Sequence, residues 1–174
     1  MRKIEKIILI GLVALLFAGC VGPKVKAPVA KDGGSYTVAV LYDRGIKADM
    51  TDPQIEQLNE LGEWAERDLL WMMKNAGYQA RQIQDRSEFD PASGEYLLSV
   101  QVIRYNPGSK AMRIIIGYGA GATSLDRFYE LYDSDSVPLL SRNQGVGSSI
   151  DWSTVVQKLN REMIDAVSST LAGQ

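Results

Sequence analysis

The fold of this protein is decided by residues 36–77, which read YTVAVLYDRGIKADMTDPQIEQLNELGEWAERDLLWMMKNAG. The first seven residues are β-branched, aromatic or apolar, and Gly-Gly-Ser precedes them while Asp43 follows, so they predict a strand. Both faces of this strand are apolar, which indicates a position inside a sheet. A loop is expected over residues 43–50. Asp52 is then predicted as the N-cap of a helix with Pro53 at its first helical position.

The second half of this stretch has the apolar spacing of a helix. Apolar or small residues recur every three or four positions and predict one packed face, formed by Ile55, Leu58, Gly62, Ala65, Leu69, Met72 and Ala76. Gly77 is expected to end the helix in the left-handed conformation. Trp64 and Trp71 are seven positions apart and therefore flank one side of this helix. Packing in the core or at the sheet edge is one interpretation of the pair, and a stacking surface for a ligand is the other.

The rest of the chain predicts further strands and one last helix. Strands are expected over residues 78–83, 95–105, 123–132 and 137–142, and loops over residues 84–94 and 143–149. Pro138 indicates an edge strand. The last helix is expected from Asp151 to about Leu171. The predicted fold class is α+β. It is a mixed β-sheet of about four to five strands with two main helices packed on one face, in the order β-α-β-β-β-β-α, as a single domain over residues 36–174.

Composition excludes several function classes. The chain has 174 residues, 45% of them hydrophobic, with a net charge of −2, no histidine and one cysteine. Without histidine, Ser-His-Asp catalysis, Cys-His catalysis and His-ligated zinc are excluded. A single cysteine excludes an internal disulfide. The absence of a basic excess argues against nucleic acid as a partner.

The N-terminus has the pattern of a secretory signal peptide. A short basic start precedes an unbroken apolar run over residues 7–18, and small residues follow it. The run is shorter than the roughly 18 residues that a membrane-spanning helix needs. We therefore predict a signal peptide over residues 1–19; an uncleaved N-terminal anchor is the alternative.

Residues 16–20, Leu-Phe-Ala-Gly-Cys, resemble the lipobox of bacterial lipoproteins, with Phe17 where leucine is usual. The resemblance implies that Cys20 carries a covalent diacylglycerol and an N-acyl chain, so the partner expected at this end is a membrane. No other cofactor and no metal is expected. Val21, where some inner-membrane lipoproteins have aspartate, favours the periplasmic face of the outer membrane, while the inner membrane stays open.

The segment after the cysteine is predicted to be a tether. Residues 20–35 are rich in Pro, Gly and Lys and have no periodicity. They either let the domain reach a partner or simply clear the lipid headgroups. The first 19 residues carry a charge of +2 and the whole chain −2, which leaves −4 for the remainder. An acidic domain has no overall electrostatic attraction to an anionic membrane.

A glycine-rich segment is the sharpest local motif. Gly117, Gly119 and Ala122 match the spacing of the dinucleotide-binding fingerprint, but no βαβ unit follows them, which argues against nucleotide binding. Glycines in such a run indicate either a bulge or a close crossing of two backbones. The third interpretation is a loop that binds a partner, formed by Gly117, Tyr118, Gly119 and Gly121.

Carboxylates are the remaining catalytic candidates. Asp133 and Asp135 lie in a predicted hairpin turn, and Asp85, Glu88 and Asp90 share a loop. Acidic residues in loops are usually solvated turn formers, and Asp133-x-Asp135 is too short for a calcium loop of the EF-hand type. We predict no catalytic residues and a protein that is not an enzyme; an uncommon hydrolase using Asp133 and Asp135 is the least favoured alternative.

The stretch from Arg113 to Leu140 is similar to a bacterial lipoprotein family called domain of unknown function 4410. The similarity rests on the lipobox, on Gly-Tyr-Gly-Ala-Gly at residues 117–121, and on a strand that ends in Asp133 before a turn. The family pattern usually has a glycine in that turn, where this chain has Ser134-Asp135-Ser136. The family has no established activity, so the resemblance assigns no catalytic role.

Two functions from different classes follow from these observations. The first is an outer-membrane-anchored, non-enzymatic lipoprotein that takes part in envelope assembly by binding an envelope protein or itself. Its aromatic residues suit an interface. The alternative is a periplasmic module that binds a small molecule, a glycan or a lipid, with Trp64, Trp71 or Tyr118 as stacking surfaces.

Overall fold

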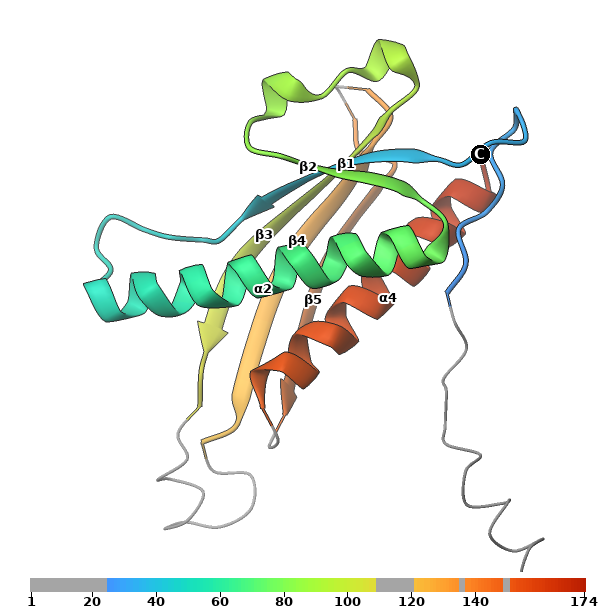
Figure 1. Cartoon of the computed structure of the whole chain (residues 1–174). Coiled ribbons are helices and arrows are strands. Elements are labelled where there is room, and N and C mark those ends of the chain that lie inside the picture. The colour runs from blue at the N-terminus through green and yellow to red at the C-terminus, as the bar shows by residue number, and fades with distance from the viewer. Residues whose placement is uncertain (1–24, 109–120, 135–136, 149–150) are drawn as a thin grey trace, which may run out of the picture.

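A single mixed sheet carries the whole domain. The computed structural model describes residues 25–108, 121–134, 137–148 and 151–174. The five strands are β1 (Thr37–Asp43), β2 (Gln79–Ile83), β3 (Tyr96–Asn106), β4 (Thr123–Tyr132) and β5 (Leu140–Ser148), arranged in the order β2-β1-β3-β4-β5. β2, β1 and β3 are parallel, while β4 and β5 continue the sheet in antiparallel fashion. Two long helices, α2 (Asp52–Ala76) and α4 (Trp152–Ala172), lie on one face of the sheet (Figure 1). The α+β prediction and its element order are confirmed.

The start of α2 differs from the prediction by one residue. The N-cap is Thr51, not Asp52, and its backbone is extended. The backbone N–H of Thr51 donates to Oε1 of Gln54 at 2.9 Å, the return bond of a capping box. Because Gln54 reaches back to residue 51, Asp52 and Pro53 lie inside the first turn. At the other end Gly77 has φ +108 and closes the helix as predicted.

The main core lies between the sheet and the two helices. Val38, Val40, Leu98 and Val100 point from the parallel strands into this layer, and the helices meet them with largely apolar faces. The buried residues of α2 are Leu58, Leu61, Gly62, Ala65, Glu66, Leu69, Met73 and Ala76. Met73, rather than the predicted Met72, is fully buried, because α2 faces both the sheet and α4 and so buries a wider arc than one stripe.

The last strand is longer than predicted. Residues 143–149 are predicted as a loop, but β5 runs from Leu140 to Ser148 and pairs with β4 along its length. Gly145 lies opposite Asp126, and a Cβ at Gly145 would collide with the Asp126 carboxylate. This glycine therefore makes room for a cross-strand side chain, whereas the sequence alone reads it as a loop residue. The predicted start at residue 137 is wrong, because β5 begins at Leu140 and Pro138 lies before it, but the strand is at the edge of the sheet as predicted.

The opposite face of the sheet is covered only in part. Ala39, Ile83, Phe89, Leu97 and Tyr132 form a second, small apolar cluster there. The connection between β2 and β3 folds over it with two short 3-10 helices, η1 (Arg86–Glu88) and η2 (Pro91–Ser93). The guanidinium of Arg86 stacks 4.4 Å from the ring centre of Tyr132. Beyond this loop the sheet is more open, and Ile103 is 49% exposed there.

Part of the predicted tether contacts the domain. The segment before β1 passes the C-terminal end of α2 (Figure 1), where the backbone N–H of Ala27 donates to the carbonyl of Ala76 at 2.8 Å. Val25, Ala27 and Ala30 pack against the core. Val29 and Ser35 form an isolated antiparallel bridge. Residues 25–35 are thus held on the domain, while the boundaries of signal peptide and tether stay predictions.

Candidate functional site

Several predicted site residues lie outside the described residues: Cys20, Gly117, Tyr118 and Gly119. The partner-binding role of the glycine segment therefore stays a prediction. Gly121, at its end, has φ +66. A Cβ at Gly108 would collide with the carbonyl oxygen of Gly121. The two glycines thus lie where the backbones at the ends of β3 and β4 approach each other closely.

The two tryptophans of α2 have different environments. Trp64 is half-buried and packs edge-on against Trp152 of α4, with 5.3 Å between the ring centres. Trp71, two turns later, is 63% exposed. Trp64 therefore belongs to the contact between the helices, whereas Trp71 presents its ring to the surface. Seven-residue spacing placed them on one side of α2, but only α4 decides which of them is covered.

Trp71 borders a shallow, open groove of about 650 Å³ on the outer side of α2. The other lining residues are mostly charged: Arg44, Glu63, Glu66, Arg67, Leu70, Lys74 and Gln82. Glu66 is buried and accepts from Nε2 of Gln82 at 2.8 Å. Nη1 of Arg44 donates to Oδ1 of Asn59 at 2.8 Å, and Nε of Arg44 lies 3.5 Å from Oε1 of Glu66. The side chains of Arg67 and Lys74, by contrast, have no polar partner among the described residues, so two cations flank the exposed ring.

The outer edge of β5 is the second candidate surface. β5 is nine residues long, contains no proline, and carries a single charged residue, Arg142. No described strand lies beyond it in the sheet. A hollow of about 440 Å³ lies on its helix side, between Arg142, Glu162 and Asp165, and another of about 320 Å³ lies on its open side, beside Asn143 and Gly145. An edge strand with spaces on both sides suits an added strand, whose side chains alternate between the two faces.

A chain of hydrogen-bonded side chains, centred on a buried arginine, connects β5 to β4 and α4. Arg127 of β4 is 1% exposed, and its Nη1 donates to Oδ1 of Asn160 in α4 at 2.6 Å. Nη2 lies 3.4 Å from Oε1 of Gln144 in β5, and Gln144 in turn donates to Glu162 at 3.0 Å. Sequence reasoning missed this chain. The signal that could have found it is the alternation of Leu125, Arg127, Tyr129 and Leu131, which places an arginine on the inward face of β4.

Asn160 also connects this chain to α2. Its Nδ2 donates to Oδ2 of Asp68 at 2.8 Å and contacts the carbonyl of Ala65 at 3.3 Å. Partial burial raises the pKa of the Asp68 carboxyl, and the hydrogen bond from Asn160 works against that rise. Asp68 and Glu162 thus lie at the two ends of a chain whose centre is the Arg127 guanidinium. The arrangement ties both helices to β4 and β5.

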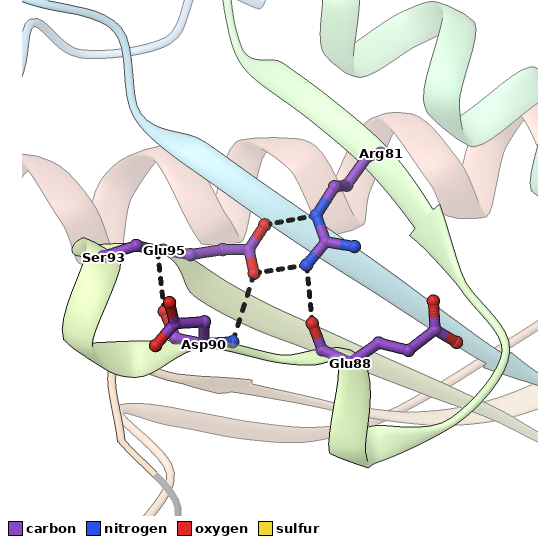
Figure 2. A network of polar contacts seen from close by, with 5 residues as sticks. All are labelled: Arg81, Glu88, Asp90, Ser93 and Glu95. Carbon is purple, nitrogen blue, oxygen red and sulfur yellow. Dashed lines mark hydrogen bonds and ion pairs between the residues drawn. The ribbon is translucent and has the colours of Figure 1, made fainter.

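The acidic residues of the loop between β2 and β3 have structural roles. Asp85 and Asp90 accept backbone N–H groups at the starts of η1 and η2. Figure 2 shows the centre of this loop, where Nε and Nη2 of Arg81 bind the two carboxylate oxygens of Glu95, each at 2.7 Å. Glu95 is 4% exposed, and the hydrogen bonds from Arg81 hold its pKa below the ordinary value. Arg81 and Glu95 were not predicted from the sequence. Asp133 lies outside this network, in the turn after β4, and Asp135 is not among the described residues.

Two properties of the described part of the chain bear on its chemistry. No cluster of three or more His, Cys, Asp or Glu side chains in it has the arrangement to hold a metal ion. No helix in it is both long and apolar enough to cross a membrane.

Comparison with solved structures gives relatives in fold. Two structures of the PelC dodecamer from Paraburkholderia phytofirmans match with a TM-score of 0.51. One is a point variant, 15% identical over 84% of this chain and 95% of that chain, and the other is 16% identical over 85% and 94%. A putative neuraminyllactose-binding hemagglutinin homolog from Helicobacter pylori is 9% identical over 85% and 88% of the two chains, with a TM-score of 0.37.

No curated protein matches the sequence. The model of one protein family does match, and it covers residues 44–170, which is most of the chain and nearly all of the domain. The description of this family names no activity. This chain belongs to the DUF4410 family, a domain of unknown function.

Proposed function

We propose that this protein is a non-enzymatic lipoprotein of the bacterial envelope that assembles with copies of itself through the outer edge of β5. Its anchor is the lipid on Cys20, and its location is the periplasmic face of the outer membrane. Assembly is its activity, so the functional surface is an interface and not a catalytic cleft.

The observation that carries this proposal is the weak protection of the outer edge of β5. Edge strands in soluble proteins are commonly protected by charged side chains, proline, bulges, short length or a covering loop. Among the described residues, β5 has one such feature, the charge of Arg142, but it has no lysine, proline or bulge and is nine residues long. Its outward backbone groups supply hydrogen bonds to an added strand, and the hollows beside Asn143 and Arg142 receive side chains from it. The fold relatives also support assembly, since PelC is described as a dodecamer.

One antiparallel register suits a second copy on this edge, and it is the register that we propose. If the pairing is centred on Gln144, Asn143 of one chain lies opposite Gly145 of the other, and Ser141 lies opposite Gly147. Each glycine then faces a side chain. The two Arg142 residues are offset by four positions, roughly 13 Å along the strands, so like charges do not meet. Centring the pair on Arg142 would place the two guanidinium groups opposite each other.

Cross-linking through introduced cysteines tests this arrangement in the lipidated full-length chain. In the register centred on Gln144, an Asn143→Cys residue lies diagonally from its copy, about 7–8 Å away. A short bifunctional thiol reagent should therefore give a covalent dimer in membranes. Gln79→Cys is the matched control, because it is exposed on β2 at the opposite edge of the sheet, and it should give no dimer.

A charge variant tests the same edge without a cross-linker. Ser141→Lys with Asn143→Lys adds two exposed positive charges to β5 and should convert the assembled protein to monomers in light scattering. Multimers that persist in this variant, together with no dimer from Asn143→Cys, would show that β5 is not the assembly surface.

A further inference from the structure

The chain upstream of the domain limits how the domain lies on the membrane. The described structure begins at Val25, and Cys20 is five residues before it, a span of at most about 18 Å. Ala27 is hydrogen-bonded to Ala76 at the end of α2. This step rests on the proposed lipidation of Cys20. With the lipid in place, the end of the domain that includes the C-terminal end of α2 is held near the bilayer.

Trp71 lies at that end of the molecule. It is five residues before Ala76, which corresponds to about 8 Å along the helix axis. Its indole is 63% exposed, although a ring of this size is usually covered. A tryptophan with an apolar ring and a polar N–H is favoured at the interface between lipid and water.

The groove beside Trp71 is lined by three cations and two anions, a net charge of +1, whereas the chain after residue 19 is acidic. Its two carboxylates, Glu63 and Glu66, lie 3.8 and 3.5 Å from Arg44, which leaves Arg67 and Lys74 as the cations next to the ring. Arg67 and Lys74 lie one turn before and one turn after it, and their side chains have no polar partner among the described residues. Lys26 and Lys31, both exposed, lie in the segment that passes the same end of α2 (Figure 1), with Asp32 as the acidic residue there. The chain after residue 19 is acidic overall, so this cationic end is a local feature. Cations beside an exposed aromatic ring fit the phosphates of anionic lipids.

We propose that Trp71, Arg67 and Lys74 form a second membrane contact, which binds the anionic headgroups of the bilayer that holds the lipid anchor. The ring enters the headgroup layer, and the two cations bind phosphates on either side of it. Because anchor and contact lie at the same end of the domain, they fix its orientation. β5 lies at the opposite edge of the sheet from β2 and the Trp71 groove, so it then remains accessible to another copy of the protein.

Quenching of tryptophan fluorescence by brominated lipids tests this contact. The lipidated full-length protein is inserted into vesicles of phosphatidylethanolamine and phosphatidylglycerol with brominated acyl chains. We expect strong quenching in the native chain and loss of most of it in Trp71→Phe. Trp64→Phe is the matched control and should keep the quenching, because Trp64 packs against Trp152. The double variant Arg67→Gln with Lys74→Gln, or vesicles of phosphatidylcholine alone, should reduce the quenching at least two-fold.

Each failure has its own meaning. If the native chain does not float with the vesicles, the lipid anchor is wrong, and this contact fails together with the proposed function. If the chain floats but its fluorescence is not quenched, or Trp71→Phe is quenched as strongly as the native chain, the membrane contact alone is wrong. A fluorescence shift of Trp71 on adding a soluble glycan, without lipid quenching, would replace the membrane by a glycan as occupant of this surface.

Discussion

Arg127 on β4 donates to Asn160 on α4 across 2.6 Å, and both side chains are almost completely buried, at 1% and 0% exposure. The hydrogen-bond acceptors of this buried cation are the neutral amides of Asn160 and Gln144, the Tyr42 hydroxyl lies beside it, and its Nε has no hydrogen-bond partner among the described residues. A buried guanidinium is costly unless its hydrogen bonds are made. Asn160 is therefore the main polar contact that compensates for the burial of Arg127.

Removing Asn160 should destabilise the protein strongly. Asn160→Leu leaves the Arg127 charge buried with the long contact to Gln144 and the neutral Tyr42 hydroxyl, and we expect the free energy of unfolding to fall by about 3 kcal/mol. Urea denaturation measures this loss. The exposed neighbour Arg161→Ala is the control and should change stability by less than about 0.5 kcal/mol.

The double variant Arg127→Met with Asn160→Leu separates the buried charge from simple packing. Because methionine removes the charge that Asn160 compensates, the double variant should be more stable than Asn160→Leu alone. Additive losses from the two substitutions would contradict this account.

Glu95 should make the stability of the protein depend on pH in the acid range. The bonds from Arg81 hold the pKa of Glu95 below its ordinary value of 4.5, so the unfolded chain takes up this proton at higher pH than the folded chain does. Stability from Glu95 is therefore fully present above pH 4.5 and is lost as the pH falls through the lower folded pKa. Glu95→Gln should lower the free energy of unfolding by about 2 kcal/mol at pH 7, and it should weaken the dependence of this free energy on pH in the acid range. Glu56→Gln, on the exposed side of α2, should reproduce the native pH curve in urea titrations; an unchanged curve for Glu95→Gln would disprove the assignment.

Gly45 and Gly33 form a matched pair for backbone effects. Both have positive φ, +70 and +83, but a Cβ at Gly45 would collide with the carbonyl oxygen of Val102, while Gly33 has open space around it. Gly33→Ala should therefore cost about 1 kcal/mol from strain alone. Gly45→Ala should cost at least about 3 kcal/mol, because the β3 backbone must also move. If the two variants lower the melting temperature equally, the β3 backbone moves without an energetic penalty, and this account of Gly45 is wrong.

The lipid anchor can be tested independently of the fold. Cys20→Ser should abolish the incorporation of labelled palmitate and release the protein from membrane fractions, because no other acylation site is expected. Val21→Asp keeps the cysteine and should keep the label, but should move the lipoprotein to the inner membrane in an enterobacterial host. Normal labelling of Cys20→Ser would exclude the lipobox.

Local sequence signals determined most of the elements. The apolar strand after Gly-Gly-Ser, the stepwise apolar residues of α2 and the left-handed Gly77 depend on neighbours within a few positions, so the sequence by itself predicts β1, α2 and its end. The α+β class and the edge position of the last strand follow from the same kind of signal, as does the family. The start of α2 shifted by one residue because Thr51 and Gln54 cap it jointly, and this choice depends on a side-chain bond.

Contacts between distant segments decided the rest. Residues 143–148 look like a loop because glycine disfavours strands, but the first half of β4 pairs with them, and Asp126 needs the space at Gly145. Trp64 and Trp71 have equivalent positions in the helical pattern, and only the approach of α4 covers one and leaves the other exposed. Arg127 and Asn160 are 33 positions apart, and neither predicts the other. The sequence determined which segments form helices and strands; packing decided which side chains became buried and which surfaces remained open, because burial depends on what the whole chain places beside a residue.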